Sequence, residues 1–155
     1  MNTLLRTSLS IFAFLPAFIC AAQPAPLDCQ CDHLIDKPGI YKPKSQGTGL
    51  YFLDVQPGQT ICIKAGHYDN MRFFNFQGAV GAPIKVINCG GKVTLSNSGY
   101  SAGLVFENCR YFHVTGSGDD TLEYGISIDG TPPGASGVVV TRFSSDFEID
   151  HIEVK

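Results

Sequence analysis

Apolar and polar residues alternate along this chain in short runs of three to seven residues. The residues between the runs are rich in glycine, asparagine, serine and proline, which are typical of turns. Alternation with a period of two indicates strands that bury one face, and no run shows the helical period of about 3.6 residues. The sequence therefore predicts an all-β fold and excludes a doubly wound α/β fold. The strands are expected at 51–55, 61–66, 72–76, 84–87, 93–95, 104–106, 112–114, 126–128, 138–140, 147–149 and 152–154.

A short sequence motif is repeated along the chain. The sequence VINC at 86–89 reappears as FENC at 106–109, 20 residues later, and IDG at 128–130 and IDH at 149–151 follow after 22 and 21 more. Short β-rich phrases repeated with this period predict a solenoid that adds one coil per repeat. On this hypothesis Val86, Phe106, Ile128 and Ile149 stack inward in one column, with coils about 4.8 Å apart.

Asn88 and Asn108 occupy the same position of the repeated phrase. Asparagine tolerates the left-handed backbone of a corner, and stacked amides can form a ladder between coils. We expect such a ladder; the alternative is two unrelated turn asparagines.

Two stretches resemble a known family. Residues 57–68 (PGQTICIKAGHY) and 77–86 (QGAVGAPIKV) are similar to the entry coil of secreted polysaccharide lyases, including chondroitinase-B-like enzymes. The resemblance implies that residues 50–155 form a right-handed parallel β-helix of the pectate-lyase-like superfamily. No catalytic motif of those enzymes is matched. Because the chain stops inside an expected strand at Val154-Lys155, we expect it to be the N-terminal portion of a longer β-helix, with the missing C-terminal coils as a partner.

The N-terminal region has the pattern of an export signal. Met1–Arg6 carries one positive charge, 9–19 is apolar, and small residues at 20–22 suit cleavage, so we expect a signal peptide at 1–22. The apolar stretch is too short to span a bilayer, and no second long one follows. A lipoprotein anchored at Cys20 is the alternative. Residues 23–49, interrupted by four prolines, are expected to be a linker and N-terminal cap, and the location secreted, periplasmic or on the cell surface.

Charge and cysteines narrow the partners and the compartment. The net charge is −3 without a basic block, so nucleic acid is not an expected partner. Five cysteines follow the signal, at 29, 31, 62, 89 and 109, so at least one is free or pairs outside the chain. For Cys29 and Cys31 we expect a disulfide or inert thiols rather than zinc ligands. For Cys89 and Cys109 we expect a stack without a bond, because coil spacing exceeds the Cβ separation of a disulfide.

Three carboxylates follow inward apolar residues in the repeated phrase, namely Glu107, Asp129 and Asp150. One coil apart, they would form an outward acidic column that could hold Ca²⁺, which prefers oxygen ligands. A solvated acidic face and direct acid/base catalysis are the alternatives.

Further candidates lie near this column. His113 is a candidate general base, or else an ordinary surface residue, and Tyr111 could stack on a sugar ring. Glu153 is expected in the same outward column as His113. His151 is expected to form a structural hydrogen bond, and Asp119-Asp120 to form an exposed corner rather than a calcium loop.

Two functions follow from these expectations. The first is a secreted β-helix protein that acts on polysaccharide, as a lyase or hydrolase of acidic glycans, although we expect this chain alone to be inactive. The alternative is a non-catalytic exported β-helix that serves glycan binding or cell-surface structure.

Overall fold

The computed structural model describes residues 29–43, 51–97 and 102–155, and these residues form parallel β-sheets. No helix occurs in the described ranges, so the predicted all-β class is confirmed. The strands are β1 (His33–Ile35), β2 (Gly39–Lys42), β3 (Tyr51–Phe52), β4 (Thr60–Tyr68), β5 (Met71–Phe74), β6 (Ile84–Ser96), β7 (Ala102–Glu107), β8 (Arg110–Thr115), β9 (Ile126–Asp129), β10 (Ser136–Thr141), β11 (Ser145–Asp150) and β12 (Ile152–Val154).

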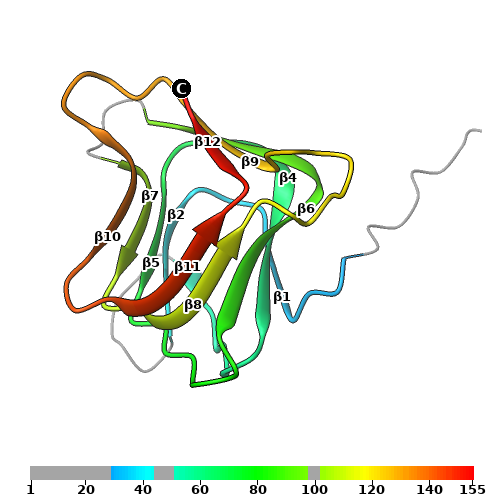
Figure 1. Ribbon diagram of the computed structural model, residues 1–155, viewed down its shortest axis with the longest axis vertical. Helices are drawn as coiled ribbons and strands as arrows, with labels where there is room; N and C mark the ends of the chain where they lie inside the picture. Colours follow the sequence, from blue (N-terminus) through cyan, green and yellow to red (C-terminus); the bar gives the residue numbers. More distant parts are fainter. Residues whose placement is uncertain (1–28, 44–50, 98–101) are drawn as a thin grey trace, which may run out of the picture.

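The chain passes back and forth between two sheets. The larger has seven strands in the order β1-β4-β6-β8-β11, with β9 on the second half of β6 and β12 on β9. The smaller has five strands in the order β10-β7-β5-β2-β3. Figure 1 shows β5, β7 and β10 on one side of the molecule and β4, β6 and β8 on the other. Each strand therefore pairs in parallel with a strand from another passage of the chain.

The core lies between the sheets and is built by alternation. In β6 and β8 the residues Ile84, Val86, Phe112 and Val114 are buried, whereas Lys85 between the first two is exposed. Burying such apolar side chains contributes about 1.5–3 kcal/mol each. The predicted inward positions in these strands are confirmed.

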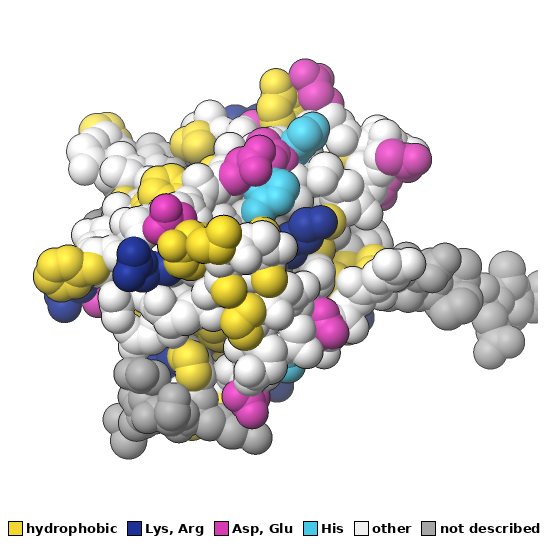
Figure 2. All heavy atoms as spheres, turned by 60° about the horizontal axis from the view of Figure 1, so that its bottom comes forward, with side chains coloured by type: hydrophobic (Ala, Val, Ile, Leu, Met, Phe, Trp, Pro, Cys, Tyr) yellow, Lys and Arg dark blue, Asp and Glu magenta, His cyan; other side chains and the backbone are white. Residues whose placement is uncertain are grey.

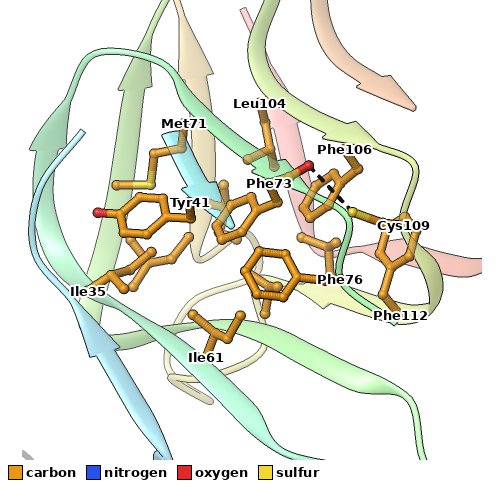
Figure 3. Close-up of a cluster of buried hydrophobic side chains, with 14 of the residues drawn as sticks. Ile35, Tyr41, Ile61, Met71, Phe73, Phe76, Leu104, Phe106, Cys109 and Phe112 are labelled. Carbon is orange, nitrogen blue, oxygen red and sulfur yellow. Dashed lines mark hydrogen bonds between the residues drawn. The ribbon is translucent and has the colours of Figure 1, made fainter. Parts of the chain in front are cut away.

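Aromatic rings stack inside this core. Phe73, Phe106 and Phe112 form a continuous series with centroid separations of 5.0 and 4.8 Å. Tyr41 extends the series at one end and Phe147 at the other, at 5.5 and 5.3 Å. Figure 3 shows the rings of Tyr41, Phe73 and Phe106 in succession, with Cys109 beside them. Stacked rings thus link the inner faces of both sheets.

The predicted inward column is wrong. Val86 and Ile149 both pair with Val114 in the larger sheet, so they are separated by one strand. Phe106 lies in β7 of the smaller sheet, and Ile128 lies in β9 on the second half of β6. The four residues therefore occupy three different rows.

The physical reason is that the strand partners of the four repeated phrases are further apart in sequence than 20–22 residues. Ile61 pairs with Val86, 25 residues later, and Phe112 pairs with Phe147, 35 residues later. The phrase at 86–89 lies within β6, whereas the phrase at 106–109 crosses the corner between β7 and β8. Similar sequence motifs thus occupy different structural positions, one within a strand and the other at a corner.

The asparagine ladder exists, but with another partner. Asn108 donates from Nδ2 to Oδ1 of Asn75 at 2.8 Å, and both have positive φ, 54° and 61°. Asn88 lies in β6, where its amide donates to the carbonyl of Gly91 at 2.9 Å and accepts from the N–H of Gly118 at 2.8 Å. The expected pairing of Asn88 with Asn108 is therefore wrong.

Two disulfides attach the start of the described chain to the larger sheet. Cys29 is bonded to Cys89, and Cys31 to Cys62. The expected Cys89–Cys109 stack is therefore wrong, because Cys89 pairs with the N-terminal segment. Cys109 is a free, buried thiol, in agreement with the odd number of cysteines after residue 22.

The paired strands begin earlier than the predicted boundary at residue 50. β1 pairs with β4, and β2 lies between β3 and β5, so part of the expected cap at 23–49 belongs to the sheets. The expected signal peptide at 1–22 lies outside the described residues. Within the described part of the chain, no helix is long and apolar enough to cross a membrane.

Candidate functional site

The outer face of the larger sheet carries a row of polar side chains. Lys85 pairs with His113, and His113 with Glu148, so the three follow one another on β6, β8 and β11. They point outward because their neighbours in sequence are apolar and inward. On the face that Figure 2 shows, two histidine side chains lie against acidic side chains, next to a basic side chain. The sheet thus brings together residues far apart in sequence.

Asp150, two residues beyond Glu148, is the centre of a hydrogen-bond network. Its Oδ2 lies 2.6 Å from Nε2 of His113, and its Oδ1 lies 2.5 Å from Nδ1 of His151. The hydroxyl of Thr115, its partner in register, donates to the same Oδ1. The backbone N–H of Ser117 in turn donates to Oγ1 of Thr115 at 3.2 Å. The carboxylate is therefore held in one orientation by three side chains, two from β8 and one from the corner after β11.

This network keeps Asp150 ionised. Burial raises the pKa of its carboxyl group, but hydrogen bonds with Thr115, His151 and His113 outweigh burial and lower the pKa to about 2. A carboxylate that receives several hydrogen bonds favours its charged form. Asp150 is thus an anion at any physiological pH.

His113, Glu148 and Asp150 form a compact cluster. One ligand atom from each lies within 4.8 Å of the other two. The side chain of Glu148 is exposed and makes no hydrogen bond or ion pair with the rest of the described chain. The cluster can therefore accept a proton, bind a hydrogen-bonding ligand or hold a cation.

A cleft of about 380 Å³ borders this cluster. Its lining includes Tyr111, His113, Phe147 and Glu148. Phe147 is 48% exposed, and the guanidinium of Arg110 lies 5.9 Å from the centre of the Tyr111 ring. Aromatic surface beside a few polar groups is the usual composition of a site for small organic ligands.

The predicted acidic column does not form. Glu107 lies in the smaller sheet, where its Oε1 is 3.1 Å from Nε of Arg142. Asp129 lies in β9, and the hydroxyl of Ser127 donates to it at 2.5 Å. Only Asp150 lies in the outward cluster, so a shared calcium site of these three residues is wrong. The cause is again the unequal spacing of strand partners.

Two other predictions concern Glu153 and His151. Glu153 pairs in register with Ser127 and forms ion pairs with Lys92 and Lys155, so it does not share a column with His113. His151 does form the expected structural hydrogen bond, but to Asp150. It follows Asp150 as Asn88 follows Ile87, and Ile87 and Asp150 both pair with Thr115, so His151 and Asn88 occupy equivalent positions.

The expected corner at Asp119-Asp120 is confirmed. Asp119 accepts hydrogen bonds from the backbone and the hydroxyl of Thr121, and these lower the pKa of its carboxyl group. Asp120 is exposed. The carboxylate of Asp119 is therefore occupied in stabilising the turn.

Sequence reasoning found His113 and Asp150 but missed Lys85, Thr115 and Glu148 as their neighbours. The missing signal was the register of β6, β8 and β11, which no local pattern encodes. Alternation alone did place Lys85 outward, and the same rule applied to β11 would have placed Glu148 and Asp150 on one face.

Comparisons with known proteins add no family. The chain matches no family model, and searches of curated proteins and of solved structures return no match.

Proposed function

We propose that this chain forms an exported right-handed parallel β-helix that binds polysaccharide. The parallel pairing of successive passages supports coils of a helix, and residues 1–22 have the pattern of an export signal. The two disulfides favour an oxidising compartment outside the cytoplasm. Secretion, periplasmic export or cell-surface display each fit this pattern.

The observation that carries the proposal is the cleft beside the polar row. Sugars bind to proteins through aromatic faces, which cover their C–H surface, and through polar groups, which pair with hydroxyls. Tyr111 and Phe147 supply aromatic surface, and His113 and Glu148 supply polar groups at the same cleft. Lys85, next to His113 in register, is a cation that makes no ion pair within the described chain, so we infer an acidic glycan as ligand.

Binding of defined oligosaccharides to the full chain tests this proposal. We expect an acidic oligouronate to bind more tightly than a neutral oligosaccharide of the same length, measured by isothermal titration. Lys85→Gln should reduce the preference for the acidic ligand about twofold to fivefold, equivalent to one surface ion pair of up to about 1 kcal/mol. Lys37→Gln, an exposed lysine between β1 and β2, is the matched control. Equal binding of both glycans by wild type and Lys85→Gln would contradict the acidic ligand.

A second function, cleavage of the glycan, is favoured by the His113–Asp150 pair. A histidine oriented by a carboxylate is a suitable general base. In a lyase reaction His113 would take the proton from the carbon beside the sugar carboxylate. The electron pair would then form a carbon–carbon double bond as the neighbouring glycosidic C–O bond breaks, and the leaving oxygen would gain a proton from water. The unsaturated product absorbs ultraviolet light. We expect wild type to raise the absorbance of a glycan solution at a rate proportional to protein concentration. His113→Gln should abolish this rise.

Calcium belongs to the same test. An acidic glycan and the carboxylates Glu148 and Asp150 repel each other, and a divalent cation between them would screen that repulsion. We propose that Ca²⁺ in the buffer increases glycan binding, and titration with and without a calcium chelator measures the difference. If titration with each of the glycans gives no binding heat, the protein does not bind polysaccharide by this face.

A further inference from the structure

We infer that His113, Glu148 and Asp150 form a binding site for a divalent transition-metal ion such as Zn²⁺ at the rim of the cleft. The site differs from the predicted calcium column in place, in ligands and in the ion that it suits. Its role toward a glycan rests on the proposed function, but its existence does not.

The first support is convergence of the ligand atoms. Glu148 and Asp150 lie two residues apart on β11, so they share a face, and His113 lies opposite Glu148 on β8. The three ligand atoms lie within 4.8 Å of one another, and the closest pair, His113 Nε2 and Asp150 Oδ2, is 2.6 Å apart. A cation about 2.0–2.2 Å from each donor would take the place of the proton that this pair shares.

The second support is the fixed orientation of Asp150. The carboxylate uses Oδ1 for Thr115 and His151, which leaves Oδ2 facing His113. Hydrogen bonds that hold a ligand in this way are a regular feature of metal sites, because they set the direction of the donor atom. Glu148, by contrast, has no competing partner within the described chain and is exposed, so it can turn toward an ion without breaking a contact.

The donor set decides which ion fits. One imidazole nitrogen and two carboxylates suit Zn²⁺ or a similar first-row ion, which binds three protein ligands and leaves one position open. Ca²⁺ takes six to eight oxygen ligands and gains little from imidazole. Two carboxylates balance the charge of the ion, although the neighbouring cation Lys85 opposes its binding.

The open position gives the ion a function in glycan binding. His113 and Glu148 both line the cleft, so a hydroxyl or carboxylate of a bound sugar can complete the coordination shell. A nitrogen lone pair bound to a metal cannot accept a proton. The metal-loaded protein should therefore bind glycan without cleaving it, and Zn²⁺ should inhibit any lyase activity that depends on His113.

The test uses the full chain after treatment with chelator. Co²⁺ is added as a spectroscopic substitute, and Zn²⁺ binding is measured by isothermal titration. We expect one site per chain, with visible Co²⁺ absorption typical of a nitrogen–oxygen ligand set. Glu148→Gln and His113→Gln should each weaken Zn²⁺ binding at least about tenfold. Glu123→Gln and His67→Gln, an exposed acid and a histidine outside the cluster, are the matched controls and should bind as wild type.

Three results would overturn the site. These are no saturable binding, equal affinity in wild type and Glu148→Gln, or equal loss in the controls, which would indicate adventitious binding. Because the Glu148 side chain is exposed and has no polar partner in the described chain, its variant remains informative even if His113→Gln fails to fold. Glycan binding is measured separately in chelator. Glycan binding without metal binding would reject this site alone, and metal binding without glycan binding would reject the proposed function alone.

Discussion

At the scale of single residues, Asp150 organises the outer face of the larger sheet. It contacts His113 and Thr115 on β8, and it contacts His151 at the corner between β11 and β12. Hydrogen bonds to a charged group contribute roughly 1.5–3 kcal/mol each when both partners are well placed. The contribution of Asp150 to the free energy of unfolding therefore comes mainly from these hydrogen bonds.

We predict that Asp150→Asn lowers the free energy of unfolding by about 1–3 kcal/mol at neutral pH. The pKa of Asp150 in the folded chain is about 2, below the unfolded value of about 3.9. Its stabilisation is therefore present above about pH 4 and is lost as the pH falls toward 2. Urea unfolding with chelator present, at pH 7 and at pH 3, should show a smaller difference between wild type and Asp150→Asn at the lower pH.

The control for this variant is Asp120→Asn, at an exposed carboxylate with no partner in the described chain. It should change stability by less than about 0.5 kcal/mol. A loss in Asp150→Asn that is equal at both pH values would show that ionisation of Asp150 is not the cause.

Cys109 should be unreactive in the folded chain. Burial raises the pKa of its thiol to about 11, against an ordinary value of about 8.5. The reactive thiolate is therefore almost absent at pH 8, and the thiol donates to the carbonyl of Phe73 at 3.4 Å (Figure 3). We expect iodoacetamide to label Cys109 at least about a hundredfold more slowly in buffer than in denaturant, measured by mass spectrometry. Comparable rates in both would contradict its burial.

At the scale of elements, local patterns predicted the strands but not their partners. Alternation in 84–87 and 112–114 marked Ile84, Val86, Phe112 and Val114 as inward, and all four are buried. Alternation depends on the two faces of one strand, so a short window contains it. Register depends on the length of every corner between two strands. The corner residues 116–125, between β8 and β9, have no equivalent of equal length among the described connections, so a fixed period failed.

The disulfides were equally beyond local reasoning. Cys31 and Cys62 became neighbours because β1 pairs with β4, and Cys29 reached Cys89 at the middle of β6. Both pairings require the first described strand to join the larger sheet, whereas the sequence suggested a linker there. The prolines at 24, 26, 38 and 43 suggested that linker, yet β1 and β2 fit between Pro26 and Pro43 with Pro38 in the connection.

The Cys31–Cys62 disulfide should stabilise the start of the sheets. It closes a loop with a sequence separation of 31, and removing a native disulfide of this kind costs roughly 2–5 kcal/mol. We predict that the double variant Cys31→Ser, Cys62→Ser has a free energy of unfolding lower by that amount, measured by urea unfolding. Cys109→Ala, which removes a cysteine that forms no disulfide, is the control for losing sulfur from the core. If the double variant and wild type have the same free energy of unfolding, the disulfide does not stabilise the fold.

At the scale of the whole molecule, disulfides hold the start of the larger sheet, whereas the described strands β10, β11 and β12 carry none. β1 and β2 at the start are tied down by disulfides and by strand pairing. At the far end, β10, β11 and β12 each pair with a single strand of the described chain, namely β7, β8 and β9. Apolar side chains there remain accessible, with Phe147 48% and Val154 53% exposed. The resistance of the fold to opening should therefore decrease along the chain.

Hydrogen exchange tests this gradient directly. An edge strand leaves every second amide without a partner in the sheet, and it opens without disturbing a neighbour on its other side. We predict exchange at residues 147–155 at least about a hundredfold faster than in β6 and β8, because local opening there needs much less than the global free energy of unfolding. The measurement requires a monomer, because association through this edge would protect the same amides. Protection of 147–155 equal to that of 84–114 in a monomer would mean that the last strands are held by contacts other than those of β7, β8 and β9. A concentration-dependent rise in protection, restricted to β10, β11 and β12, would instead identify these three strands as the surface through which copies of this chain associate.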